Sequence, residues 1–342
     1  MPLACYRLPA PRSIATVSHD WAAYTRTIPH SYGFDPSHGY TLADLLKIPA
    51  PVAPEDFETF WSARYAAATT ITPKIKIQAS GSTTQGWKIH DIAYTSTGDF
   101  SVAGWLLVPE SGRVERACII GHGYGGRAAP DTDFNLPNTA LLFPCARGLG
   151  RSQVAGISSD PAWHVLHHIE NKNQYILGDC VADLWLGVSV LLEMFPQVTG
   201  HIGYMGTSFG GGIGALAVAW EPRITRAHLN VPSFGNQPLR AQLASVGSAA
   251  SVQAFLPKCP AAQHVLAYYD AASAARFIQI PMFCACALFD PAVAPAGQFA
   301  IYNALSGPKE LFILAAGHHP YALENRQAIA LKQEIHTFFH AL

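Results

Sequence analysis

The pentapeptide Gly206-Thr207-Ser208-Phe209-Gly210 places one serine between two glycines, after the apolar run HIGYM and before a small-residue stretch. G-x-S-x-G between a strand and a helix is typical of a nucleophile elbow, a sharp turn that lifts the serine hydroxyl out of a sheet. Glycines permit the strained backbone of such a turn. The pattern therefore predicts that Ser208 is a nucleophile, the alternative being a chance match in a chain with 28 glycines.

A serine hydroxyl needs a base, and the base needs a carboxylate that orients it. Behind this kind of turn the acid and then the histidine follow along the chain. Asp290 ends the apolar run PMFCACALFD, and His318 follows ELFILAAG. Asp290 could instead cap a helix, because Pro291 follows it, and His319 stands beside His318. We expect Asp290 and His318 to act, with His319 at the rim of the pocket.

Acyl transfer also needs amide donors aimed at the oxyanion. The backbone N–H of Phe209, directly after the nucleophile, is one predicted donor. The glycine-rich loop GHGYGGR (121–127) follows an apolar run and offers the second, at Tyr124. The alternative for this loop is a phosphate cradle, but neither usual glycine-rich phosphate motif is present.

Two further polar stretches have a structural interpretation. Arg147 lies in CARGLGRS, where its forked guanidinium is expected to hold loops near the site together. The segment HVLHHIE (164–170) holds three histidines and a glutamate, but its spacing matches no usual zinc signature. The predicted chemistry needs neither a metal nor an organic cofactor.

The elements that position these residues are short apolar runs separated by helical stretches. Such runs are typical of parallel strands buried on both faces, so we predict an α/β fold with a mostly parallel, doubly wound sheet. Sites in such sheets form at the carboxyl ends of strands, where each candidate residue lies. The predicted strands cover 117–123, 140–148, 201–208, 224–233, 281–290 and 310–319; the predicted helices cover 175–195, 209–220, 292–305 and 321–341.

The chain is expected to have two parts. Residues 1–72, rich in Pro, Ser, Thr and Tyr, form an N-terminal extension packed on the body, with a helix in PEDFETFWSARYAAA. Residues 73–342 form the catalytic domain, beginning with antiparallel strands at a sheet edge. A cap or insert segment is expected at about 234–279.

The composition of the chain indicates which class of molecule it is expected to bind. The 22 basic and 23 acidic residues nearly cancel, which predicts neither nucleic-acid nor membrane-surface binding and favours a small, near-neutral partner. No uninterrupted apolar stretch resembles a signal peptide or a membrane span. The seven cysteines are scattered, and most of them are interpreted as buried thiols. We therefore predict a cytoplasmic protein.

The ordered motifs resemble the acetyl xylan esterase and cephalosporin C deacetylase group, carbohydrate esterase family seven of the α/β-hydrolase superfamily. The resemblance runs from PEDFETFW to the C-terminus and includes HGYGG, RGLGRS, the serine turn and FDPAVAPAGQFAIYNALSGPKEL. It implies a serine esterase that removes acetyl from sugars and similar small alcohols. It also implies a triad of Ser208, Asp290 and His318, an oxyanion hole of the Tyr124 and Phe209 amides, and a homo-oligomer that is often a ring-like hexamer.

Two positions depart from the family pattern. Phe209 replaces the usual Gln after the nucleophile, which keeps the backbone donor and loses any side-chain contact. His319 replaces the usual Glu after the triad histidine. Both lie beside the pocket and indicate an altered substrate. The alternatives are a peptidase or acyl-transfer enzyme on the same fold, or a non-catalytic binding protein that kept the fold.

Overall fold

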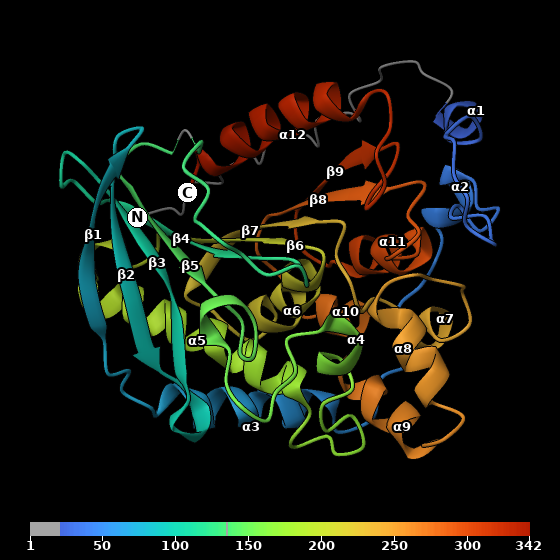
Figure 1. The fold of residues 1–342 in the computed structure, drawn as a ribbon, viewed down its shortest axis with the longest axis horizontal. Coiled ribbons are helices and arrows are strands. Elements are labelled where there is room, and N and C mark those ends of the chain that lie inside the picture. The colour runs from blue at the N-terminus through green and yellow to red at the C-terminus, as the bar shows by residue number, and fades with distance from the viewer. Residues whose placement is uncertain (1–20, 135) are drawn as a thin grey trace, which may run out of the picture.

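The computed structural model describes residues 21–134 and 136–342, and in this part of the chain nine strands form one sheet (Figure 1). The strand order is β1-β2-β3-β5-β4-β6-β7-β8-β9. The strands are β1 Lys76–Thr84, β2 Trp87–Thr95, β3 Ser101–Pro109, β4 Arg116–Gly121, β5 Thr139–Pro144, β6 Ile202–Thr207, β7 Ile224–Asn230, β8 Met282–Ala287 and β9 Lys309–Leu314.

Strand direction follows the predicted pattern. The pairs from β4 to β9 are parallel, whereas β1, β2 and β3 pair antiparallel at one edge and β3 also pairs antiparallel with β5. The prediction of a mostly parallel α/β sheet is therefore confirmed. Each strand ends one to five residues before the predicted end of its apolar run, and those last residues form the loops of the site.

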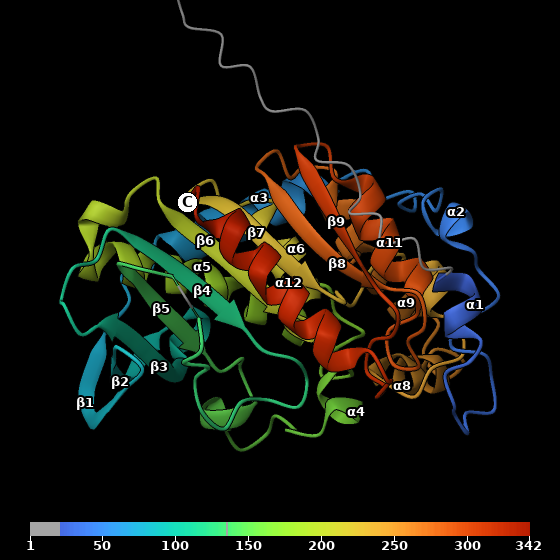
Figure 2. The ribbon, with the colours of Figure 1, turned by 90° about the horizontal axis from the view of Figure 1, so that it is seen from above.

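Helices cover both faces of the sheet. On one face α5 (Ile176–Met194) packs against α6 (Phe209–Val218), and α10 (Ala271–Ala275) lies between α6 and α11 (Pro295–Ala304). On the other face α12 (Glu324–Phe339) crosses the strands, as Figure 2 shows, and its Phe338 and Phe339 pack on apolar strand side chains. The central strands are therefore covered by helices on both faces.

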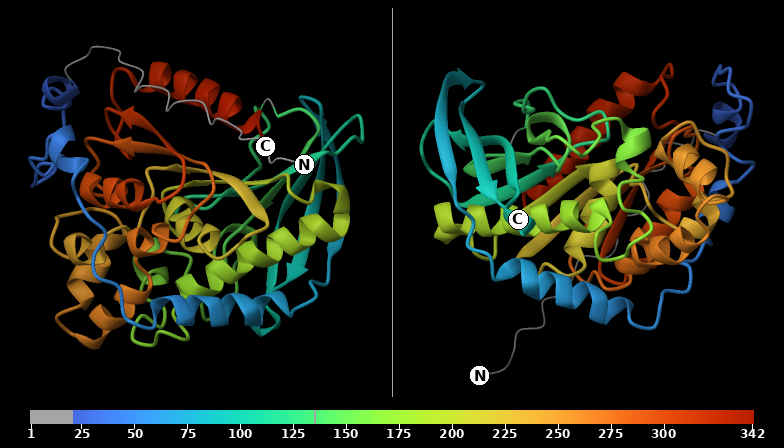
Figure 3. Two further views of the ribbon diagram at one scale, coloured as in Figure 1. Left: turned by 180° about the vertical axis from the view of Figure 1, so that it is seen from behind. Right: turned by 60° about the horizontal axis from the view of Figure 1, so that its bottom comes forward.

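The described part of the N-terminal segment contains α1 (Trp21–Thr25), α2 (Leu42–Leu45) and α3 (Phe57–Thr69). Helix α3 lies along α5 (Figure 3). Its Trp61 indole also donates to the Tyr268 carbonyl at 2.8 Å. Helix α2 contacts α11 at the end of the sheet where β8 and β9 finish. The segment therefore reaches the loops that follow these two strands.

The segment after β7, where a cap or insert is expected, contains four short helices. They are α7 (Gln237–Arg240), α8 (Ser248–Phe255), α9 (Ala261–Tyr268) and α10. Helix α10 is fully buried against α6 and α11, whereas α8 contacts α4 (Pro161–His164). No helix among the described residues is long and apolar enough to cross a bilayer.

Candidate active site

Ser208 occupies a strained turn between β6 and α6. Its φ of 54° and ψ of −113° lie outside the regions that non-glycine residues prefer. The flanking glycines are required by packing: a Cβ on Gly206 would lie 2.4 Å from the Gly210 carbonyl oxygen, and one on Gly210 would lie 2.8 Å from the Gly121 carbonyl carbon. The turn thus holds a partly exposed hydroxyl at the end of the sheet.

His318 bridges Ser208 and Asp290. Its Nε2 lies 2.9 Å from Ser208 Oγ, and its Nδ1 lies 2.8 Å from Asp290 Oδ2. An ionised carboxylate only accepts, so Nδ1–H donates to Asp290 and leaves the Nε2 lone pair for the serine O–H. The structure therefore brings together the three residues that the sequence predicts as a triad, in an arrangement able to pass a proton from the hydroxyl to the ring.

Asp290 is fully buried, and both of its oxygens have partners. Oδ1 accepts from the Ala292 and Val293 amides at 2.9 and 2.8 Å, while Oδ2 accepts from Gln298 and His318. Helix α11 begins at Pro295 with Ala294 as its N-cap, so Asp290 is not the cap of that helix. Asp290 instead accepts hydrogen bonds from two amides of the turn that precedes α11.

The environment of His318 raises its pKa. Burial alone would lower the pKa, but the negative charge of Asp290 and the hydrogen bond to it outweigh that effect. A protonated His318 cannot take the serine proton. We therefore expect kcat/KM to be lost as pH falls through a pKa above the ordinary 6.5.

The pH profile of p-nitrophenyl acetate hydrolysis tests this expectation. In Asp290→Asn both raising contributions disappear, so the residual activity should titrate at a lower pH than in the unaltered protein. If the acidic limb of the pH profile stayed at the same pH in the variant, the assignment of this titration to His318 would be contradicted.

Gln298 is a buried residue of the site that sequence reasoning missed. Its Nε2 donates to Asp290 Oδ2 at 2.9 Å and to the Val293 carbonyl at 2.7 Å, and its Oε1 accepts from the Ala287 amide at 2.8 Å. One amide thus ties the carboxylate to the end of β8. Its place eight residues after Asp290 offers no motif that could have revealed this role.

Replacing Gln298 with Leu should lower the free energy of unfolding by about 1–3 kcal/mol, because buried polar partners are left unsatisfied. It should also reduce kcat about tenfold, since Asp290 loses a positioning contact. Chemical denaturation and ester kinetics measure both effects.

Gln327 supplies the matched control. It is a buried glutamine on α12 that accepts from the Ala315 amide at 2.9 Å and donates to the Ile313 carbonyl at 3.0 Å, with no contact to Asp290. Gln327→Leu should cost similar stability without the same loss in kcat. Equal kinetic losses in both variants would show that Gln298 acts only on stability.

One predicted oxyanion donor belongs to the residue after Ser208, and the other belongs to the loop that contacts Ser208. Within the described residues neither the Phe209 amide nor the Tyr124 amide is engaged by a backbone partner. A Cβ on Gly123 would lie 3.7 Å from Ser208 Cβ, so the 121–127 loop contacts the serine. The Tyr124 and Phe209 rings pack with centroids 4.3 Å apart, which fixes the loop against the start of α6.

His122 holds this loop in place and was also missed. Its Nε2 accepts from the Ala146 amide at 2.9 Å, its Nδ1–H donates to the Gly123 carbonyl at 2.6 Å, and its own carbonyl accepts from the Gly210 amide at 2.9 Å. Burial lowers its pKa, which keeps the ring neutral and this pattern intact. It links the end of β4 to β5 and α6.

Arg147 makes the bracing contacts that its sequence context predicts. The buried guanidinium pairs with Asp183 at 2.8 Å and Asp179 at 3.3 Å, and it donates to Thr97 Oγ1 at 2.9 Å. These groups belong to α5 and to the turn before β3. Arg147 therefore holds elements together behind the site, with no contact to Ser208.

The histidine-rich segment contributes one buried ring to the same framework. His164 Nε2 donates to the Arg147 carbonyl at 2.8 Å, and its Nδ1 lies 3.4 Å from the Tyr124 hydroxyl. Burial lowers the pKa of His164 to about 4. In the described part of the chain no group of three or more His, Cys, Asp or Glu side chains is arranged to hold a metal ion.

His319 contacts the N-terminal segment instead of Ser208. Its Nε2 donates to the Pro29 carbonyl at 2.9 Å, and its Nδ1 lies 3.2 Å from the Tyr32 hydroxyl. The Asp290 amide donates to the Pro36 carbonyl at 3.2 Å. Residues 29–36 are therefore attached to the loops that carry Asp290 and His318, an arrangement that the sequence did not predict.

Solved structures of several enzymes have a fold similar to that of this chain. Acetyl xylan esterase 1 from Thermoanaerobacterium sp. JW/SL YS485 superposes with a TM-score of 0.74 at 19% identity, over 88% of this chain and 99% of that one. The acetyl xylan esterase from Paenibacillus sp. R4 gives 0.72 at 18% identity, over 86% and 99%. An acylaminoacyl peptidase from Pyrococcus horikoshii gives 0.58 at 16%, over 75% and 42%. At these identities the likeness establishes the α/β-hydrolase fold.

The family comparison is more specific, because it tests the sequence itself. The model of the acetyl xylan esterase family matches residues 44–336, which is most of the chain and includes every candidate site residue. This protein therefore belongs to the acetyl xylan esterase family, whose members are carboxylic ester hydrolases.

Proposed function

We propose that this protein is a serine esterase that removes acetyl groups from small substrates such as acetylated sugars, through a covalent acyl-enzyme. The observation that carries the proposal is the continuous line of hydrogen bonds from Ser208 Oγ through His318 to Asp290, beside two amides free to bind an oxyanion. The substrate class follows the family and the two acetyl xylan esterases of similar fold.

In the first half-reaction Ser208 Oγ attacks the acetyl carbonyl carbon while His318 Nε2 takes the hydroxyl proton. The Phe209 and Tyr124 amides stabilise the oxyanion, and Asp290 stabilises the imidazolium. When the bond to the alcohol oxygen breaks, His318 gives its proton to that oxygen. The alcohol leaves, and the acetyl group stays on Ser208.

The second half-reaction uses the same groups in reverse. His318 takes a proton from water as the water oxygen attacks the acetyl carbonyl carbon, and the oxyanion forms at the same two amides. Collapse of this intermediate breaks the bond to Ser208 Oγ, which recovers its proton from His318. Acetate is released, and the two half-reactions together consume one ester and one water molecule.

A substrate panel tests the proposal. Acetyl esters should be hydrolysed faster than butyryl and octanoyl esters of the same alcohol, and acetylated sugars should be substrates, whereas peptide amides should not be cleaved. Cephalosporin C deacetylation belongs to the same expectation. Cleavage of a blocked peptide at a rate comparable to ester hydrolysis would favour the peptidase alternative.

The binding-protein alternative is tested separately with a fluorophosphonate probe. Labelling at Ser208, located by mass spectrometry of the digested protein, is expected for an activated serine. An unlabelled Ser208 in folded protein would favour a non-catalytic role. The homo-oligomer, with a hexameric ring as its family form, and the cytoplasmic location stay predictions that sedimentation and fractionation can test.

A further inference from the structure

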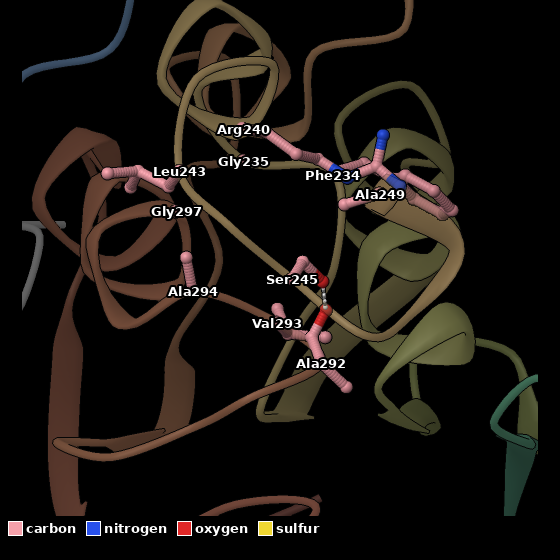
Figure 4. Close-up of a pocket in the computed structure, with 10 residues that line it drawn as sticks. All are labelled: Phe234, Gly235, Arg240, Leu243, Ser245, Ala249, Ala292, Val293, Ala294 and Gly297. Carbon is pink, nitrogen blue, oxygen red and sulfur yellow. Dashed lines mark hydrogen bonds between the residues drawn. The ribbon is translucent and has the colours of Figure 1, made fainter. Parts of the chain in front are cut away.

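An enclosed cavity beside the turn after Asp290 is too small to hold a substrate (Figure 4). It lies between the starts of α7 and α8 and that turn, where Ser245 Oγ donates to the Ala292 carbonyl at 2.9 Å. Its volume of about 20 Å³ has room for about one water molecule. Neither Ser208 nor His318 lines it. The alcohol part of an ester must therefore be held elsewhere.

A much larger groove is open beside the triad histidine. It has a volume of about 440 Å³ and lies between the ends of β6, β7 and β9 and the first turns of α12. Apolar side chains form much of its wall, and the polar residues that line it include Thr207, Asn230, His318 and Glu324. This groove has both the size and the mixed lining that a small alcohol needs.

The proposed reaction determines where the alcohol part of the ester lies. His318 Nε2 must give its proton to the alcohol oxygen, so that oxygen has to come within about 2.6–3.2 Å of the ring nitrogen. The groove is lined by this same histidine and by Thr207, which directly precedes the nucleophile. An alcohol that leaves Ser208 on the side of His318 therefore has this groove beside it.

Asn230 lies next to Thr207 in the groove. The two residues are register partners on β6 and β7, and neighbouring strands lie about 4.8 Å apart. The Asn230 carbonyl also accepts from the Ser208 amide at 2.8 Å. A Cβ on Gly203, four residues before Thr207 on β6, would lie 2.7 Å from the Phe339 ring, so this face of the strand points to α12. Asn230 is therefore fixed beside the nucleophile, on the side of the sheet that α12 covers.

The side-chain amide of Asn230 is poorly satisfied by the protein itself. Its Oδ1 is enclosed without a hydrogen-bond partner in residues 21–134 and 136–342. Because Asn230 lines the groove, the end of the amide that opens toward the groove is Nδ2. By contrast, the amides of Asn236 and Asn303 donate to backbone carbonyls at 3.0 and 2.8 Å. An amide without a protein partner, beside a reacting group, is suited to hydrogen-bond a ligand.

We propose that this groove holds the alcohol part of the acetyl ester and that Asn230 Nδ2 donates to a hydroxyl oxygen next to the ester bond. The preferred alcohols are then neutral and polyhydroxylated, with an apolar ring face, as in a pyranose. The Glu324 carboxylate at the start of α12 accepts from a further hydroxyl and repels an alcohol that carries a carboxylate. This inference rests on the proposed esterase function.

Asn230 also supports the serine turn through its backbone, so its replacement can disturb the site without any role in substrate recognition. The test must therefore compare two esters that differ at one hydroxyl. The ester trans-2-hydroxycyclohexyl acetate carries that hydroxyl next to the ester bond, and cyclohexyl acetate lacks it. The measured quantity is the ratio of kcat/KM for the hydroxylated ester to kcat/KM for cyclohexyl acetate, in which general damage cancels.

In Asn230→Leu this ratio should fall about 2- to 12-fold, the loss expected when one neutral hydrogen bond is removed. Leucine has nearly the shape of asparagine but forms no hydrogen bond. Asn230→Gln keeps an amide, so the ratio should fall less. Asn303→Leu is the matched control, because Asn303 is also half-buried and loses an amide but does not line the groove. Its ratio should equal that of the unaltered protein.

A ratio that does not change in Asn230→Leu would overturn the proposal. If the variant does not fold, product inhibition of the unaltered protein decides. The diol trans-1,2-cyclohexanediol should inhibit p-nitrophenyl acetate hydrolysis at a concentration more than about twofold lower than cyclohexanol, since twofold is the statistical advantage of two equivalent hydroxyls. A smaller difference would refute the hydroxyl contact.

Binding and turnover separate this proposal from the proposed function. Ligand-observed NMR of trans-2-hydroxycyclohexyl acetate with Ser208→Ala, and with the same protein carrying Asn230→Leu, tests the groove without hydrolysis. Hydrolysis of p-nitrophenyl acetate tests the esterase without the hydroxyl. Weaker binding in the double variant, with no turnover of any ester by the unaltered protein, would refute the esterase alone. Ester turnover with equal binding in the two variants would refute the Asn230 contact alone.

Discussion

Replacing Ser208 with Ala should reduce kcat for p-nitrophenyl acetate by about 10⁴- to 10⁶-fold, because the covalent step loses its nucleophile. The residual rate should still exceed that of water, since the Phe209 and Tyr124 amides do not depend on the hydroxyl. The fold should persist: Ser208 takes part in the turn through its backbone, with its amide donating to the Asn230 carbonyl at 2.8 Å. Steady-state kinetics and thermal melting measure these two outcomes.

Ser233→Ala is the matched control, because it removes the hydroxyl of a buried serine in the adjoining loop. Its melting temperature and kcat should both stay close to those of the unaltered protein. Ser208→Ala should in addition lose labelling by a fluorophosphonate. A Ser208→Ala protein that keeps its activity would exclude this serine as the nucleophile and with it the acyl-enzyme mechanism.

The strands of the sheet could be predicted because each one leaves a pattern within a few consecutive residues. Each buried parallel strand is a short apolar run such as MFCACA in β8, and a polar residue in the loop that follows, here Asp290, lies within a few residues of the strand end. The order serine, acid, histidine then places three such ends together, because parallel strands finish at one edge of the sheet. Ser208, Asp290 and His318 could be named from this logic alone.

The supports of the site could not be predicted in the same way. Gln298 and His122 are single buried polar residues, and what each one bonds depends on packing between elements far apart in the chain. Gln298 meets Asp290 because α11 folds back on β8, and His122 meets Ala146 because β4 and β5 are neighbours. Neither contact has a spacing rule in the sequence.

The N-terminal segment illustrates the same limit over a longer distance. The expectation of an extension packed on the body carried no information on where it packs. In the structure Pro29 and Tyr32 contact His319, and Pro36 contacts Asp290, across more than 250 residues of intervening chain. Contacts at such separation arise from the closed tertiary structure and leave no local pattern.

These contacts separate the two adjacent histidines, and His318→Ala should therefore reduce kcat by about 10⁴-fold or more whereas His319→Ala should keep most of it. His318 has one ring nitrogen on Ser208 and the other on Asp290. His319 has both ring nitrogens on the N-terminal segment, so it has no free lone pair for a serine proton. The same p-nitrophenyl acetate assay measures both variants.

Because His319 holds the N-terminal segment in place, its replacement should reduce stability and leave most of the activity. Without its ring the Pro29 carbonyl and the Tyr32 hydroxyl lose a partner, so His319→Ala should lower the melting temperature, and Tyr32→Phe should lower it less because one bond remains. An inactive His319→Ala beside an active His318→Ala would reverse the assignment of the base. His318 is the one of the two rings that contacts both Ser208 and Asp290, and we therefore expect it to act as the base.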